Sequence, residues 1–131
     1  MPAKSLYSCN FYRDTLGAGE TTEPIGWPDG YVAVFKALTL WNDGLTSYES
    51  GGVVLVQAIT NPEDPAVGAV FAAISVAPAG GIYPIAVATS LGFSYGGPDS
   101  YDDMFAFQIS NTFADQCHIS LDGYLLRYVA R

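Results

Sequence analysis

Short apolar runs separated by glycine and proline are the feature that most constrains the fold of this chain. The 131 residues include 14 glycines and 8 prolines, and these cluster between the apolar runs. Glycine and proline end strands and form the turns between them. The spacing predicts an all-β fold of about 7–9 strands, arranged as a jelly-roll-like or related antiparallel β-sandwich.

Alternation of apolar and polar residues identifies the individual strands. In residues 5–12, Tyr7, Cys9 and Phe11 fall on one face and polar residues on the other. Residues 31–41 carry apolar side chains on both faces, which predicts a strand that is covered on both sides. Further strands are predicted at residues 53–60, 67–77, 82–89, 91–95, 104–111 and 117–129.

Three of these segments leave a local choice open. Residues 67–77 are rich in alanine and also fit a short helix, although β-branched residues and flanking Pro and Gly favour a strand. Pro84 predicts an edge strand, because proline cannot donate a hydrogen bond to a neighbouring strand. The Asp122-Gly123 pair predicts either a hairpin turn or a bulge in one bent strand.

The length fits a single domain that spans residues 1–131. Within it, residues 13–30 are polar and rich in glycine and proline. A segment of this length without regular structure is long for a compact domain and is often functional. Residues 13–30 are therefore predicted to form a long loop or an arm laid on a neighbouring molecule.

The charge balance argues against several classes of partner. The net charge is −8, from 13 acidic and 5 basic residues, and the basic residues are scattered. Binding to nucleic acid or to an anionic membrane needs clustered Lys and Arg, so neither is expected. No stretch approaches the roughly 18 apolar residues of a membrane span, and residues 1–8 lack a secretory apolar region. Synthesis in a cytoplasm is expected.

The cysteines and the histidine offer little metal or redox chemistry. Cys9 and Cys117 lie near opposite ends of the chain and are expected to be buried thiols rather than a disulfide pair. One histidine and two distant cysteines cannot supply a zinc site. The acidic loop at residues 99–103 has oxygen ligands that suit Ca²⁺, but a solvated loop is the default expectation. No phosphate-binding glycine motif occurs, so no metal and no cofactor are predicted.

One segment matches a catalytic serine motif, but the residues that follow it do not fit that motif. Residues 92–96, GFSYG, match the G-x-S-x-G motif of α/β-hydrolases, and His118 follows. That motif requires a helix directly after Ser94, whereas the chain continues with a Gly-Pro-Asp turn. The side chains of Cys117 and His118 would point to opposite faces of a strand, which excludes a dyad. The protein is predicted not to be an enzyme.

Aromatic residues in or beside the predicted loops suggest a binding surface. Their side chains could stack on the apolar faces of sugars, and tyrosine and tryptophan are equally favoured at protein contacts. Only 14% of residues are charged and 50% are hydrophobic, whereas about 25% charged residues is typical. This composition favours a surface that packs against partners. The loop aromatics are Trp27, Trp41, Tyr48, Tyr95 and Tyr101.

Two segments resemble small structural proteins of tailed bacteriophages. Residues 27–40, WPDGYVAVFKALTL, are similar to a recurring frame in which Pro-x-Gly-Tyr precedes a hydrophobic strand with a basic residue. Residues 118–126, HISLDGYLL, are similar to a closing strand that often ends Ser-Gly-Tyr-Leu-Leu. The resemblance implies a β-sandwich virion protein of the minor tail or decoration type.

The composition and the resemblance together predict a non-enzymatic bacteriophage virion structural protein that acts by assembly. A minor tail protein is the first expectation, and a capsid decoration or head-tail connector protein is an alternative. A module that binds a host-surface glycan is a further alternative. The expected partners are other virion proteins and further copies of the chain, with a trimer as the expected state. The predicted interface residues are Trp27, Tyr31, Phe35, Trp41, Tyr48, Tyr95 and Tyr101.

Overall fold

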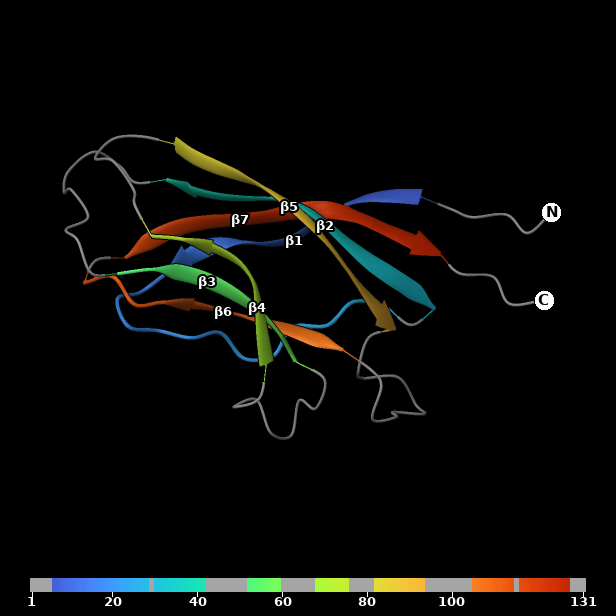
Figure 1. Ribbon diagram of the computed structural model, residues 1–131, viewed down its shortest axis with the longest axis horizontal. Helices are drawn as coiled ribbons and strands as arrows, with labels where there is room; N and C mark the ends of the chain where they lie inside the picture. Colours follow the sequence, from blue (N-terminus) through green and yellow to red (C-terminus); the bar gives the residue numbers. More distant parts are fainter. Residues whose placement is uncertain are drawn as a thin grey trace.

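Two antiparallel β-sheets pack face to face in the computed structural model of the protein (Figure 1). The structure describes residues 6–28, 30–41, 52–59, 68–75, 82–93, 105–114 and 116–127. This arrangement confirms the predicted all-β sandwich. The strands of the described residues are β1 (Leu6–Leu16), β2 (Tyr31–Trp41), β3 (Val54–Ile59), β4 (Gly68–Ile74), β5 (Ile82–Phe93), β6 (Ala106–Asn111) and β7 (Cys117–Arg127).

The strand order places β7 inside the larger sheet. That sheet runs β1-β7-β2-β5, and the smaller one runs β4-β3-β6. The ladder between β1 and β7 extends from Leu6 opposite Leu126 to Leu16 opposite Cys117, so the first and last strands pair along their length. None of the described residues forms a helix long and apolar enough to cross a bilayer.

Most local predictions are confirmed, and two strand boundaries are corrected. Residues 68–74 form a strand and not a helix, and β5, with Pro84, is an edge strand. β7 continues through Asp122-Gly123 without a turn. Residues 82–93 form one strand where two were predicted. β1 continues to Leu16, because its polar last residues pair with β7 instead of entering a loop.

The predicted arm at residues 13–30 is also corrected. Residues 13–16 belong to β1, and residues 20–25, here called the strap, lie along the outer edge of β6. Backbone N–H groups of Thr22 and Ile25 donate to the carbonyl oxygens of Ile109 and Phe107, at 2.9 and 2.8 Å. The strap therefore covers an edge of the protein's own smaller sheet, which satisfies backbone groups that a bare edge would expose.

Asn111 fastens the chain where β1 leads into the strap. Its side chain has no exposed surface. The Nδ2 group donates to the carbonyl oxygens of Leu16 and Gly17, both at 3.1 Å, and Oδ1 accepts from the backbone N–H of Phe113 at 2.9 Å. Buried polar groups of this kind are stable only when they are hydrogen-bonded, and Asn111 meets that requirement by bonding to two separate segments.

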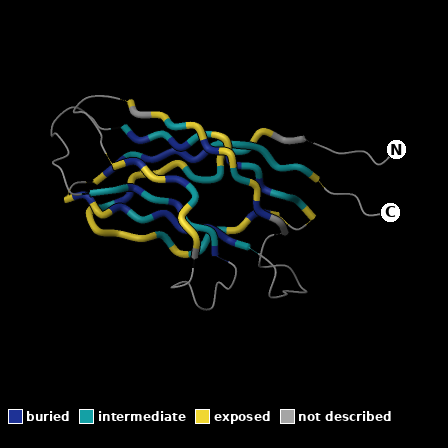
Figure 2. The backbone as a smooth tube through the Cα atoms, in the orientation of Figure 1, coloured by how far each residue is buried: buried dark blue, intermediate teal, exposed yellow. Residues whose placement is uncertain are grey.

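The core between the sheets is centred on Phe35. Buried residues alternate with more exposed ones along the strands (Figure 2). The ring of Phe35 is fully buried, and its centroid lies 4.6 Å from that of Phe11, 4.9 Å from Phe71 and 5.5 Å from Phe107. Trp27 packs on the same cluster, with its ring stacked on Phe107 at 6.5 Å. Tilted and edge-on ring pairs add to the hydrophobic gain of burial.

Two bulges, one in β1 and one in β2, lie opposite neighbouring steps of β7, on either side of Asp122. Phe11 is an extra residue of β1 between the pairs Asn10–Asp122 and Tyr12–Leu121. Lys36 is an extra residue of β2 between Phe35 and Ala37. Each bulge reverses the alternation of faces along its strand. As a result, Phe35 and Leu38 both face the core, although they lie three residues apart.

Gly123 makes the close packing at these bulges possible. A Cβ atom at this position would collide with the backbone carbonyl oxygen of Val34 and would lie 3.1 Å from Cε2 of Phe11. Because the glycine has no side chain, the Phe11 ring can turn inward above it to reach Phe35.

Candidate functional site

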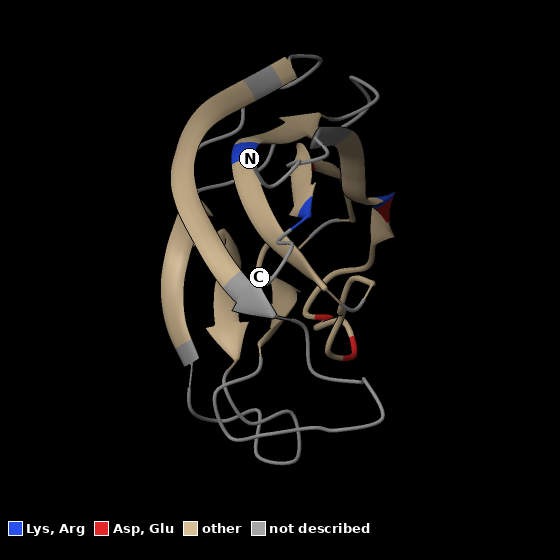
Figure 3. Ribbon diagram, turned by 90° about the vertical axis from the view of Figure 1, so that its right-hand side faces the viewer, with Lys and Arg blue, Asp and Glu red and all other residues tan. Residues whose placement is uncertain are grey.

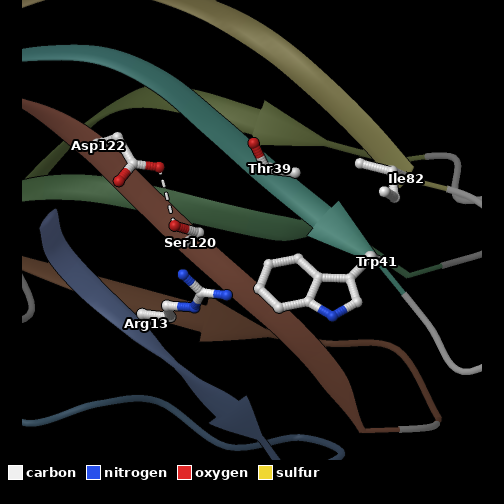
Figure 4. Close-up of a pocket in the computed structure, with 6 residues that line it drawn as sticks. All are labelled: Arg13, Thr39, Trp41, Ile82, Ser120 and Asp122. Atoms are coloured by element: carbon white, nitrogen blue, oxygen red, sulfur yellow. Dashed lines mark hydrogen bonds between the residues drawn. The ribbon is translucent and has the colours of Figure 1, made fainter.

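An open depression lies on the outer face of the larger sheet, on the side away from the core (Figure 4). The strand registers create it. Thr39 lies opposite Ser120, and Ser120 lies opposite Arg13, so three neighbouring strands present their side chains side by side. The volume of the depression is about 370 Å³. Its lining residues are Arg13, Thr39, Trp41, Ile82, Ser120 and Asp122.

Trp41 forms the aromatic part of the depression. Its indole lies across β7 with a ring face turned outward (Figure 4). The imidazole of His118, directly opposite in the ladder, is stacked with it at a centroid distance of 5.7 Å and 25° between planes. The Oγ1 atom of Thr15 lies 2.7 Å from Nδ1 of His118. The Arg13 guanidinium lies 5.9 Å from the Trp41 centroid, in range of a cation–π interaction.

A hydrogen-bonded group of three polar side chains forms the other part. Nδ2 of Asn10 donates to Oδ1 of Asp122 at 2.6 Å and to Oγ of Ser120 at 3.0 Å. The Ser120 hydroxyl donates to Oδ2 of Asp122 at 2.8 Å. Both carboxylate oxygens of Asp122 are therefore held in fixed positions, and each keeps capacity to accept a further hydrogen bond.

Charged residues are sparse along the described strands (Figure 3). The depression contains one cation, Arg13, and one anion, Asp122. Within the described residues, no group of three or more His, Cys, Asp or Glu side chains is placed to hold a metal ion. The chemistry that this lining offers is stacking on an indole, together with donation and acceptance of hydrogen bonds.

Two side chains of β1, Cys9 and Tyr12, have raised pKa values in the folded protein. Burial raises the pKa of the Cys9 thiol above 9.0, and the charge of Asp122 adds to the shift. Burial also raises the pKa of Tyr12 above 10.0, with contributions from Asp14 and Glu20. Both groups hold their protons more tightly in the folded state. The stability that they contribute is therefore complete below pH 9.0 and is lost as the pH rises through the raised folded pKa values.

We expect the free energy of unfolding to fall as the pH rises above 9.0, and the Cys9→Ala variant to show a shallower fall. Urea unfolding followed by tryptophan fluorescence on either side of pH 9.0 measures this. Tyr12→Phe should reduce the remaining slope above pH 10. Identical pH slopes for the wild type and both variants would contradict the assignment.

The predicted interface residues divide into three groups. Trp41 lies in the depression, as a surface residue should. Trp27 and Phe35 are instead buried in the core between the sheets. Trp27 is fixed there because its Nε1 donates to the carbonyl oxygen of Tyr31 at 3.0 Å. Tyr31 is half-buried against the core. Tyr48, Tyr95 and Tyr101 lie outside the described residues.

The serine motif and the cysteines contribute no site among the described residues. Gly92 and Phe93 end β5, whereas residues 94–96 and the acidic loop 99–103 lie outside the described residues. Cys117 is buried and His118 is half-exposed, which confirms that they point to opposite faces. Cys9 and Cys117 are free thiols, and in the β1–β7 ladder Cys9 lies opposite Gly123 whereas Cys117 lies opposite Leu16.

A second surface lies where the edge strands β4 and β5 meet, here called the β4/β5 side. Among the described residues, the exposed large hydrophobic side chains are Val70 of β4, at 53%, and Ile82 of β5, at 73%. Ile82 also lines the depression. The other edges are protected: the strap covers β6, and β1 carries the exposed charges Arg13 and Asp14. β5 contains Pro84, but β4 has neither a charge nor a proline.

Several residues of the depression carry no signal in the sequence. Arg13 lies in a segment whose sequence predicts a loop. Ser120 and Asp122 fit the pattern of ordinary polar residues on the outer face of a strand. They come together only through the register of β1, β7 and β2.

The protein was compared with protein-family models, with curated proteins and with solved structures, and none of the three comparisons gave a match.

Proposed function

We propose that the protein is a non-enzymatic structural component of a bacteriophage virion that acts by assembly, as a minor tail protein. The observation that supports assembly is the exposure of Val70 on the edge strand β4. Apolar side chains on edge strands gain free energy when a neighbour covers them, at roughly 25 cal/mol per Å² of buried apolar area.

The partner proposed for this edge is an extended strand of a second copy of the chain. β4 is made only of Gly, Ala, Val, Phe and Ile. It therefore lacks the charges and prolines with which proteins discourage edge pairing. A strand added to β4 would extend the smaller sheet and cover Val70. This is the β-augmentation mode of recognition, in which the backbone supplies the hydrogen bonds and alternate side chains supply specificity.

We expect the wild-type protein to be a homo-oligomer, with a trimer as the proposed state, and Val70→Lys to reduce it to the 13.9 kDa monomer. A lysine at an edge strand carries a charge that a neighbouring strand would have to desolvate. Size-exclusion chromatography with light scattering measures both masses. Circular dichroism checks that the variant keeps its fold.

Ser8→Lys is the matched control, because it adds the same charge to an exposed position on the opposite edge strand, β1. It should leave the mass unchanged. A wild-type protein that stays monomeric at high concentration, or an equal effect of both lysines, would refute assembly through β4.

The proposed place in a virion has alternatives in a capsid decoration or head-tail connector protein. The sequence resemblance at residues 27–40 and 118–126 supports the virion assignment, and the exposure of Val70 on β4 supports assembly in any of these positions. The neighbouring genes test the choice. Genes for tail-length and tail-tip proteins would support the tail, and a capsid gene would support the head. Neighbours of neither kind would count against a virion role.

A further inference from the structure

We infer that the depression on the outer face of the larger sheet binds one neutral pyranose ring of a saccharide. This inference does not depend on the proposed assembly, which uses the free edge of β4 and Val70. The depression, at about 370 Å³, lies near the small end of ligand sites, which span roughly 300–1,000 Å³. That size suits one sugar ring better than a protein segment.

The indole of Trp41 supplies the platform for the apolar face of the sugar. A face of its ring is turned toward the viewer in Figure 4, and the imidazole of His118 is stacked with it at 5.7 Å. The hydrogen bond between Thr15 and His118 fixes the supporting imidazole. The electron-rich face of an indole attracts the C–H groups that a pyranose presents on one side. Ile82 adds exposed apolar surface at the rim.

Asp122 and Arg13 supply the polar contacts at the edge of the platform. Asn10 and Ser120 hold both oxygens of Asp122 in place, so its orientation is set before a ligand arrives. Each oxygen can still accept a hydrogen bond from a sugar hydroxyl. Arg13 offers guanidinium donors beside the same ring. An acceptor and a donor placed side by side match a pair of adjacent sugar hydroxyls, because a hydroxyl can both donate and accept.

The charges of the depression favour a neutral saccharide over an acidic one. A sugar carboxylate would gain the attraction of Arg13 but would face the carboxylate of Asp122 on the neighbouring wall. The net charge of −8 adds repulsion at longer range. A neutral sugar ring is repelled neither by Asp122 nor by the net charge, and it can form hydrogen bonds with both Arg13 and Asp122.

The two tryptophans of the chain provide a direct test. Protein labelled with 5-fluorotryptophan should give one ¹⁹F resonance for Trp41, in the depression, and one for Trp27, in the core. Titration with a panel of neutral methyl pyranosides should shift the Trp41 resonance saturably, with a Kd on the order of 1 mM. The Trp27 resonance should not move, and it reports that the fold is intact.

Asp122→Asn and Arg13→Ala should each raise the Kd at least about tenfold, because each removes a charge-assisted hydrogen bond. Trp41→Ala removes the resonance that reports binding, so binding to this variant is measured from the NMR signals of the ligand. It should be abolished. Val70→Ser, on the other sheet, is the control and should leave the Kd unchanged. Absence of any Trp41 shift, binding of uronates alone, or equal shifts of both tryptophans would each overturn the inference. None of these results would alter the oligomer mass that tests assembly.

Discussion

Asn111→Asp should lower the free energy of unfolding by about 4 kcal/mol near neutral pH, the range found when a buried charge is left without a partner. The side chains have the same shape, so the change creates no cavity. It replaces the Nδ2 group, which donates to the carbonyl oxygens of Leu16 and Gly17, with an oxygen that repels both. The site has no solvent exposure that could relieve the charge. Urea unfolding of the two proteins measures the difference.

The pH dependence of this loss of stability shows whether the buried charge causes it. Burial next to two carbonyl oxygens raises the folded-state pKa of the new carboxyl above its unfolded value of about 3.9. The folded variant therefore binds a proton more tightly than the unfolded chain, and its deficit against the wild type should shrink as the pH falls from the raised value toward about 3.9. Gln108→Glu is the control. Gln108 donates through Nε2 to the carbonyl oxygen of Thr22, and its replacement should cost only about 1.5 kcal/mol. Equal losses at the two positions would show that Asn111 has no special role.

Gly123→Ala should cost about 3 kcal/mol, at the upper end of the usual range for overpacking. The added Cβ would collide with the carbonyl oxygen of Val34, which belongs to a central strand paired on both sides. A side chain can rotate away from such a collision, but this backbone cannot move without breaking its ladders. Thermal unfolding followed by circular dichroism measures the loss.

Two further variants distinguish the collision with the Val34 carbonyl from backbone strain and from contact with the Phe11 ring. Gly19→Ala places a Cβ in open space at φ +73°, so it should cost only the strain of a left-handed residue, about 1 kcal/mol. Adding Phe11→Leu to Gly123→Ala should not restore stability, because the main obstacle is the Val34 carbonyl and not the ring. Full recovery in the double variant would place the collision at Phe11 instead.

The sequence predicts the strands well because alternation is a local property. β2 begins and ends where the apolar pattern predicts. Along β1, Cys9 and Phe11 are partly buried while Ser8 and Asn10 are exposed, as their alternation indicates. These faces depend only on which side of a pleated backbone each side chain leaves.

Strand partners and bulges could not be predicted, because they depend on distant residues. Phe35 and Trp41 lie six residues apart and would share a face of a regular strand. The bulge at Lys36 instead sends Phe35 into the core and Trp41 to the outer face. The bulge at Phe11 likewise brings Arg13 to the same face as Asn10. The depression therefore results from the two bulges in β1 and β2, which lie on either side of Asp122 of β7.

The central place of β7 has a consequence for how the chain folds. β7 follows the other strands in sequence, yet it separates β1 from β2 in the larger sheet. β1 has no neighbour in that sheet until β7 is available. Pairing across so long a stretch of chain carries a large loop-closure entropy, which slows folding. During synthesis on the ribosome, the larger sheet can be completed only after β7 emerges, and until then β1 and one edge of β2 remain unpaired and open to mispairing.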